Sequence, residues 1–143
     1  MARILLIDDD EPVRTIVSGA LTHFGHSVIE ARDGVEGLEL FAHAATDLVI
    51  TDLVMPRKSG REVMRVLREQ KPLVKIIAMS GGDRSGLLNA LSSAKLDGAA
   101  QVLAKPFTIP ALLAVVQEVL ASGDARALDR SSDLHGTGPA GAE

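Results

Sequence analysis

Five short apolar runs alternate with helix-like segments, and this alternation restricts the fold of the chain more than any other feature. The runs cover residues 4–7, 27–30, 48–51, 76–79 and 102–104. Runs that are apolar at nearly every position fit strands buried on both faces, as in a parallel sheet covered by helices. Strands that alternate with helices are typical of the doubly wound α/β class. The second run is more polar than the others, so we expect it at an edge of the sheet.

The segments between the runs carry signals for the starts of helices. Asp33 and Ser59 are each followed three residues later by a glutamate, which is the spacing of a capping box. The helix after Thr108 is expected to reach about residue 121, and a looser helix is expected over 85–96. The first helix is expected to bury an apolar face made of Val13, Ile16, Val17, Ala20 and Leu21.

The composition allows one domain with a sizeable core and excludes several classes of protein. The chain has 143 residues, of which 46% are hydrophobic, enough for one domain. It contains no cysteine, which excludes disulfides and thiolate metal sites and fits a cytoplasmic protein. Its apolar runs fall short of the roughly 20 residues that span a bilayer, so we expect no membrane insertion. The net charge of −4 argues against direct binding to nucleic acid.

The character of the sequence changes near residue 121. Residues 1–121 contain all the apolar runs and helical segments and are expected to form one domain. Residues 122–143 are rich in Gly, Ser, Ala and Asp without a periodic apolar face, so we expect a disordered tail. This tail is too short for a helix-turn-helix or an enzymatic output domain. We therefore expect a stand-alone protein, although a domain cut from a longer chain would have the same sequence.

Four of the five apolar runs end in polar residues of distinct kinds. Asp8 and Asp9 follow the first run, Asp52 the third, Ser80 the fourth and Lys105 the fifth. In a parallel sheet with helices on both faces, ligands bind beyond the carboxyl ends of the strands. These side chains should therefore meet at one edge of the sheet.

This set of side chains suits phosphoryl transfer. Clustered carboxylates repel one another, and a hard divalent cation such as Mg²⁺ relieves the repulsion, with Asp8 and Asp9 as its carboxylate ligands. Lys105 offers a compact positive charge to an anion, and Ser80 offers a hydroxyl donor. Asp52 is then available to attack a phosphoryl group. The sequence predicts Mg²⁺-dependent phosphoryl transfer onto Asp52.

The motifs around these residues resemble those of the CheY-like receiver family of response regulators. They are ILLIDDDEPVR at residues 4–14, TDLVMP at 51–56, MSG at 79–81 and AKPF at 104–107. All four occur in the order of the family, and the resemblance covers roughly residues 2–121. It implies a flavodoxin-like (βα)5 fold whose parallel strands lie in the order 2-1-3-4-5.

The resemblance also implies a role for each residue of the metal site. Asp52 would be the phosphoacceptor and would itself contact the metal. Asp9 would bind Mg²⁺ directly, and Asp8 would help through water. The backbone carbonyl of Val54 would complete the protein ligands.

By the same resemblance, Ser80 and Lys105 would contact the phosphoryl group, and the Lys105-Pro106 peptide bond would be cis. The phosphoryl donor would be a sensor histidine kinase or a histidine phosphotransfer protein. The output would be contact with a downstream protein target or onward phosphotransfer. A separate observation is that the last helix has an apolar stripe wider than the sheet is expected to cover, so we expect a partner or a homodimer on the fourth and fifth helices.

Three features depart from the family pattern, and one of them is a stretch from Ser80 to Lys105 that is slightly longer than usual. Val102 stands where many receivers have an aromatic residue, so we do not expect the usual coupling of a hydroxyl residue to a ring. Val54 has no polar side chain to position water, which predicts slow self-dephosphorylation. Phosphatases with an aspartyl-phosphate intermediate usually have a second Asp at that position, so we expect a phosphoacceptor switch and not a hydrolase. An interaction module that is never phosphorylated remains the alternative.

Overall fold

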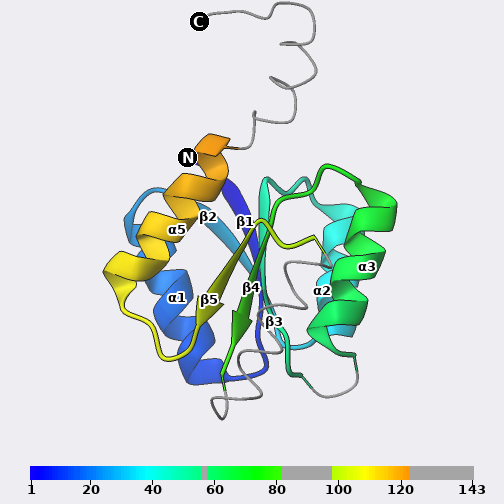
Figure 1. Cartoon of the computed structure of the whole chain (residues 1–143), viewed down its shortest axis with the longest axis horizontal. Helices are drawn as coiled ribbons and strands as arrows, with labels where there is room; N and C mark the ends of the chain where they lie inside the picture. Colours follow the sequence, from blue (N-terminus) through cyan, green and yellow to red (C-terminus); the bar gives the residue numbers. More distant parts are fainter. Residues whose placement is uncertain (56–57, 82–97, 123–143) are drawn as a thin grey trace, which may run out of the picture.

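The computed structural model describes residues 1–55, 58–81 and 98–122. A single sheet lies between two layers of helices (Figure 1). Its elements are, in chain order, β1 (Arg3–Ile7), α1 (Glu11–His23), β2 (Ser27–Ala31), α2 (Gly34–His43), β3 (Leu48–Asp52), α3 (Gly60–Gln70), β4 (Ile76–Ser80), β5 (Gln101–Ala104) and α5 (Ile109–Ala121). The predicted helix over 85–96 and the predicted tail beyond Ser122 lie outside the described residues.

The five strands are all parallel and lie in the order β2-β1-β3-β4-β5. This confirms the flavodoxin-like strand order predicted above. Strand β2 is an edge strand with a partly exposed burial pattern, as its polar sequence predicted. Strands β3 and β4 are buried at every position, as expected for the centre of a sheet covered on both faces.

The strand registers bring the carboxyl ends of four strands to nearly the same level. Strand β1 ends opposite Thr51 of β3. Asp52 lies opposite Met79 of β4, and Ser80 lies opposite Ala104 of β5. The polar residues at these strand ends therefore share one edge of the sheet.

Two apolar cores lie on the two faces of the sheet. Side chains alternate between the faces along β1, so Leu5 and Ile7 enter one core while Ile4 and Leu6 enter the other. Helices α2 and α3 cover the first core, and helices α1 and α5 cover the second, on opposite sides of the sheet in Figure 1.

Helix α1 packs most of its predicted apolar face against the core, but it buries Arg14 and exposes Ile16. Its buried residues are Arg14, Val17 and Leu21, whereas Ile16 is 60% exposed. The prediction that Ile16 belongs to the buried face was wrong. At about 100° per residue, positions 14, 17 and 21 form one stripe toward the sheet, and position 16 lies about 100° or more around the helix from each of them.

Helix α5 is capped by the Thr108 side chain, which accepts a hydrogen bond from the Ala111 N–H. Its buried residues are Leu112, Val116 and Val119, while Leu113, Val115 and Leu120 are partly buried against the same core. Among the described helices, none has the length and apolar character needed to cross a membrane.

Candidate functional site

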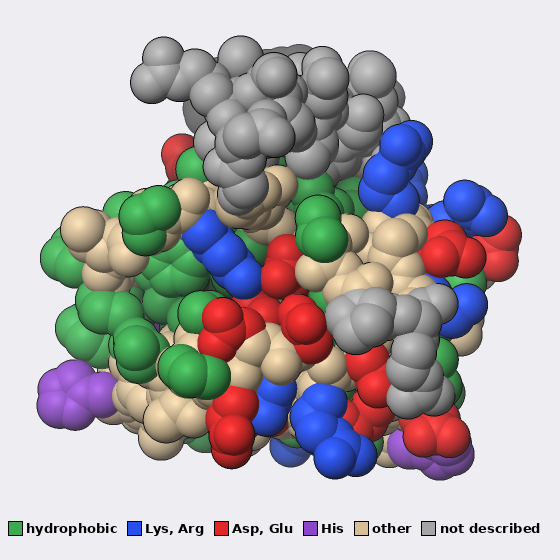
Figure 2. Space-filling model, turned by 90° about the horizontal axis from the view of Figure 1, so that it is seen from below, with side chains coloured by type: hydrophobic (Ala, Val, Ile, Leu, Met, Phe, Trp, Pro, Cys, Tyr) green, Lys and Arg blue, Asp and Glu red, His purple; other side chains and the backbone are tan. Residues whose placement is uncertain are grey.

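The residues that end strands β1, β3 and β5 meet at the carboxyl edge of the sheet. Lys105 Nζ lies 2.9 Å from Asp8 Oδ2 and 2.9 Å from Asp52 Oδ2. The structure thus brings together three side chains that are far apart in sequence, as their strand-end positions predicted. Viewed onto this edge, acidic side chains gather near the middle of the face (Figure 2).

Asp8 is completely buried, and its polar groups are paired. Its N–H donates to the Ala31 carbonyl (3.1 Å), and its carbonyl accepts from Arg14 Nη1 (2.7 Å). Its Oδ1 accepts from the Asp10 N–H (2.9 Å), and its Oδ2 accepts from Lys105. A buried carboxylate is tolerated only with such partners, so Asp8 is held rigidly at the end of β1.

Asp52 is 6% exposed and is held at both carboxylate oxygens. Oδ1 accepts from the Val54 N–H (3.2 Å), and Oδ2 accepts from Lys105. Burial is the main reason that the pKa of Asp52 is raised, and the nearby charge of Asp8 raises it further. The hydrogen bond and charge of Lys105 oppose this effect but do not outweigh it.

Lys105 is the cation between the two buried carboxylates. Burial disfavours its charge, but the hydrogen bonds and charges of Asp8 and Asp52 outweigh burial and raise its pKa. Lys105 therefore stays protonated, and one positive charge faces two carboxylates. The excess of negative charge suits the binding of an additional cation.

The oxygen atoms of Asp8, Asp9 and Asp52 could serve a metal ion together. One carboxylate oxygen from each residue lies within 4.8 Å of the others. Asp9 is exposed, so its carboxylate is open to solvent at the mouth of the site. A set of carboxylate oxygens fits a hard cation such as Mg²⁺. The Val54 N–H bonds to Asp52, and the proposed role of the Val54 carbonyl remains a prediction.

Ser80 lies at the end of β4 beside this cluster. It is 1% exposed, and its Oγ has no hydrogen-bond partner within the described part of the chain. The adjoining backbone is fixed, because the Lys105 N–H donates to the Ser80 carbonyl (2.7 Å). A buried hydroxyl without a partner costs free energy, so this position favours a ligand that accepts its hydrogen bond.

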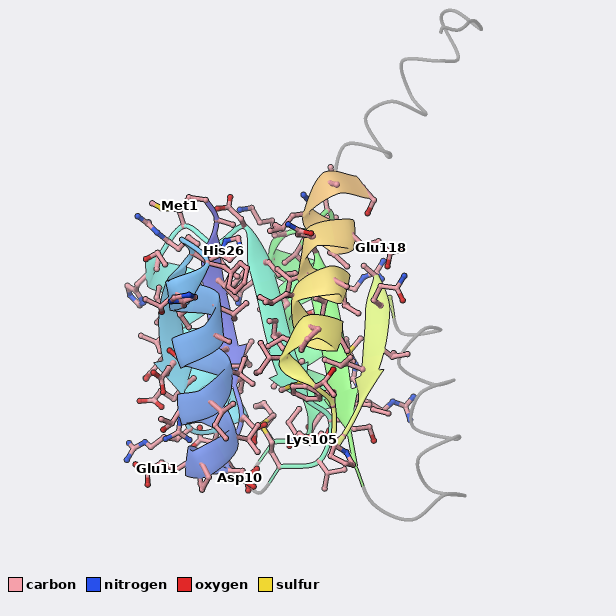
Figure 3. All side chains as sticks on the ribbon, turned by 90° about the vertical axis from the view of Figure 1, so that its left-hand side faces the viewer. Met1, Asp10, Glu11, His26, Lys105 and Glu118 are labelled. Atoms are coloured by element: carbon pink, nitrogen blue, oxygen red, sulfur yellow. The ribbon has the colours of Figure 1, made fainter. Side chains whose placement is uncertain are left out.

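A shallow apolar groove of about 400 Å³ adjoins the site. It lies between α1 and the segment after β5, and the Lys105-Pro106 peptide bond in its wall is cis, as predicted. The groove is lined by Val13, Ile16, Val17, Lys105, Pro106, Phe107 and Ile109. Figure 3 shows Lys105 at the same end of the molecule as Asp10 and Glu11, where α1 begins.

Sequence reasoning missed Arg14. This arginine is 9% exposed and binds the backbone carbonyl of Asp8. The sequence did contain a signal, because Arg14 shares a helical stripe with Val17 and Leu21. A charged residue on a buried stripe needs a partner, and here the partner belongs to the site.

Comparison with known proteins gives a consistent family. Residues 4–117 match the response regulator receiver domain. The chain is 39% identical over 118 residues to the response regulator MprA of Mycobacterium sp. (strain KMS), covering 82% of the chain and 50% of MprA. It is 33% identical over 147 residues to the DNA-binding transcriptional regulator NtrC of Azospirillum brasilense, covering 97% of the chain and 30% of NtrC.

Among solved structures, the chemotaxis protein CheY4 of Vibrio cholerae matches with a TM-score of 0.75 and 31% identity. That match covers 83% of the chain and 98% of CheY4. The chain thus spans half or less of the length of MprA and NtrC, but nearly the whole of CheY4.

Proposed function

Because the chain belongs to the response regulator receiver domain family, which acts in two-component signalling, we propose that it is switched by phosphoryl transfer onto Asp52. The observation that carries this proposal is the Lys105 ammonium, held 2.9 Å from both Asp8 and Asp52 at the carboxyl edge of the sheet. It supports Asp52 as the acceptor, because a fixed cation beside the nucleophile can stabilise charge on a transferring phosphoryl group.

In the proposed reaction, a carboxylate oxygen of Asp52 forms a bond to phosphorus while the bond from phosphorus to the donor breaks. Lys105 stabilises the negative oxygens of the phosphoryl group. The Ser80 hydroxyl, which has no partner among the described residues, donates a hydrogen bond to one of them. The product is an acyl phosphate on Asp52, and the departing donor group keeps the electron pair of the broken bond.

We propose Mg²⁺ as the cofactor, held by the carboxylates of Asp8, Asp9 and Asp52 with the backbone carbonyl of Val54. The close grouping of the three carboxylates supports this assignment. When bound, Mg²⁺ offsets the negative charge of the phosphoryl oxygens. The chain's own contribution is to hold Asp8 and Asp52 in place through Lys105 and the backbone N–H groups of Asp10 and Val54.

The direct test is intact-mass spectrometry after incubation with acetyl phosphate and Mg²⁺. We expect one phosphoryl adduct on the wild type, none on Asp52→Asn, and none on the wild type in EDTA. Asp47→Asn is the matched control, because Asp47 is an exposed aspartate just before β3, and it should be labelled normally. A wild type that no donor labels, including a panel of kinases, would favour the interaction module that is never phosphorylated.

We propose a switch rather than a turnover enzyme. Val54, two residues beyond the acceptor, is 70% exposed and has no acidic or basic group to activate water. Hydrolysis of the acyl phosphate should therefore be slow. A Val54→Asn variant with an acyl-phosphate lifetime as long as that of the wild type would contradict this explanation.

The donor in this proposal is a histidine kinase or a histidine phosphotransfer protein in the cytoplasm, and it must bring its phosphohistidine to Asp52. The apolar groove beside Lys105 supports docking there, since an exposed apolar surface next to a reactive site favours a protein partner. Ile16, at 60% exposure, is its most accessible described aliphatic residue. The downstream target is a protein, and the DNA binding in the name of NtrC belongs to that longer relative.

Substitution within the groove separates docking from chemistry. Ile16→Asp should slow phosphorylation by a protein donor and leave labelling by acetyl phosphate unchanged. Leu73→Asp is the matched control, because Leu73 is 51% exposed and precedes β4 at the opposite end of the sheet. Equal slowing in the two variants would contradict docking at the groove.

We also propose that residues 1–121 form the receiver domain and that 122–143 form a disordered tail. A homodimer through the fourth and fifth helices remains a prediction, and of these two only α5 lies within the described residues. Sedimentation of the phosphorylated protein would test the dimer.

A further inference from the structure

Arg14 is the one buried cation of α1, and it binds the backbone that presents Asp8 and Asp9. Its side chain is 11% exposed. Nη1 donates to the Asp8 carbonyl at 2.7 Å, and Nε lies 3.4 Å from Glu30 Oε1 on β2. One guanidinium therefore connects the end of β1 to the neighbouring edge strand.

The position of the Asp8 carbonyl explains why such a contact is needed. The parallel ladder of β1 with β2 and β3 ends at Ile7, so the Asp8 carbonyl lies beyond the paired residues. A buried carbonyl without a donor would be costly, and Arg14 supplies the donor from the first turns of α1. The chain turns into α1 within the next three residues, and Asp9 lies in that turn.

We propose that Arg14 is a positioning residue for the divalent cation site, acting through the Asp8 carbonyl to fix the Asp8-Asp9 turn. This inference rests on the proposed function, because it assumes that Asp8 and Asp9 hold Mg²⁺. Arg14 bonds to the backbone of Asp8 and leaves both carboxylate oxygens to Asp10 and Lys105. Arg14 therefore orients the carboxylates of Asp8 and Asp9 through the backbone, and it is not itself a ligand of the metal.

A geometric role needs the planar fork of arginine. Two donors on one rigid group reach Asp8 and Glu30 together, whereas a lysine carries a single ammonium on a flexible stem. If the charge alone mattered, a lysine at position 14 would serve equally well. The comparison of Arg14→Lys with Arg14→Met therefore separates positioning from charge.

The chain offers a matched control in a second arginine–glutamate pair. Arg32 Nε lies 3.5 Å from Glu36 Oε1, close to the 3.4 Å of the Arg14–Glu30 pair, but the Arg32 side chain is 76% exposed. Its loss removes the same chemical group without touching the Asp8 carbonyl. Arg32→Met should behave as the wild type in every measurement below.

The experiment measures Mg²⁺ affinity by calorimetry, in the absence of any phosphoryl donor and at a temperature where circular dichroism reports a folded protein. We expect Arg14→Met to weaken Mg²⁺ binding about tenfold, as is typical when a group that orients metal ligands is lost. Arg14→Lys should also bind more weakly than the wild type. In the metal-free protein, the amide NMR signals of Asp8, Asp9 and Asp10 should shift in Arg14→Met and not in Arg32→Met.

Glu30→Ala provides a second route if Arg14→Met does not fold. Glu30 is 43% exposed on an edge strand, so its loss should leave the fold intact while releasing Arg14 on one side. We expect Mg²⁺ affinity to fall by about threefold to fivefold, and Glu36→Ala to leave it unchanged. Mg²⁺ binding within twofold of the wild type in Arg14→Met or Glu30→Ala, or full affinity in Arg14→Lys, would overturn the inference. A wild type that binds no Mg²⁺ would instead overturn the proposed metal site itself.

Discussion

The two ends of the sheet both carry polar side chains, but these side chains have different kinds of partner. At the carboxyl end, Lys105 is shared by the buried carboxylates of Asp8 and Asp52. At the amino end, side chains bind single backbone groups: Asp47 Oδ2 accepts from the Arg3 N–H (2.8 Å), and Lys75 Nζ donates to the Leu120 carbonyl (3.3 Å). Figure 3 shows this separation, with Lys105 and Asp10 at one end and Met1 and His26 at the other.

This difference shows that the reactive groups of the fold lie at the carboxyl end of the sheet. A side chain that satisfies a backbone group at the amino end contributes to stability with little opposing cost. At the carboxyl end, two buried carboxylates share one lysine and repel each other in the metal-free protein. The amino end therefore resembles an ordinary structural surface, while the carboxyl end is held ready for a cation and a phosphoryl group.

The largest effect is expected from Lys105→Met. Removing the shared cation leaves Asp8 and Asp52, whose side chains are 0% and 8% exposed, without their charged partner. We expect the free energy of unfolding in EDTA to fall by about 3 kcal/mol, and labelling by acetyl phosphate to be lost. Urea unfolding and intact-mass spectrometry would measure the two effects.

Lys75→Met is the matched change at the amino end. It removes one hydrogen bond to a backbone carbonyl, so the free energy of unfolding should fall by at most about 1 kcal/mol. Labelling should be unaffected. Equal destabilisation by the two lysine substitutions would remove the proposed difference between the ends.

The second effect concerns backbone packing behind the site. Gly60 begins α3 against the end of β3, and a Cβ at this position would collide with the backbone of Asp52 and Leu53. We expect Gly60→Ala to lower the free energy of unfolding by about 2 kcal/mol and to slow labelling by displacing Asp52. Thermal or urea unfolding measures the first effect.

Gly19→Ala is the control for this substitution. Gly19 lies within α1, and a Cβ there would meet no atom within 4 Å. The free energy of unfolding should therefore rise by up to about 1 kcal/mol, because alanine favours the helix more than glycine. A destabilised Gly19→Ala, or an unaffected Gly60→Ala, would contradict this account of the packing.

Short-range patterns were sufficient to predict the strands and the convergence of the site, whereas the order of the strands was predicted from the resemblance to the receiver family. Apolar runs predicted the strands, and the polar residue after each run predicted which side chains meet. The contacts of Arg14 and the exposure of Ile16 were not predicted, because they depend on how α1 is rotated against the sheet. That rotation is set by packing, and hydrophobicity alone favoured Ile16 over Arg14 for the buried stripe.

The third effect concerns the substitution of aspartate by asparagine, which should change the free energy of unfolding in opposite directions at the two ends of the sheet. Asp52→Asn removes one of two buried carboxylates around Lys105, so the free energy of unfolding in EDTA should rise by about 1 kcal/mol. Asp47→Asn weakens a hydrogen bond from the Arg3 N–H, so it should lower the free energy by about 0.5 kcal/mol. Changes of the same sign in urea unfolding at pH 7 would refute the distinction.

The smallest effect tests whether the amino end responds to pH on its own. His26 Nδ1 accepts a hydrogen bond from the Ala2 N–H (3.1 Å), which requires the unprotonated nitrogen. Burial, with a smaller contribution from the positive amino terminus, lowers the pKa of His26 below 6.5. The stability contributed by this group is therefore complete above pH 6.5 and is lost as the pH falls through the lowered pKa of the folded state.

His26→Asn should remove this part of the pH dependence. Between pH 7.5 and 5, we expect the wild type to lose up to about 1 kcal/mol more than the variant in urea unfolding. Both proteins keep Asp8, Asp52 and Lys105. The difference between their pH-dependent changes in the free energy of unfolding therefore excludes the titration of the carboxyl end. His23→Asn, on an exposed side chain of α1, should follow the wild type. If His26→Asn showed the same pH dependence as the wild type, the pH response would come from the carboxyl end alone, and the amino end would contribute none of it.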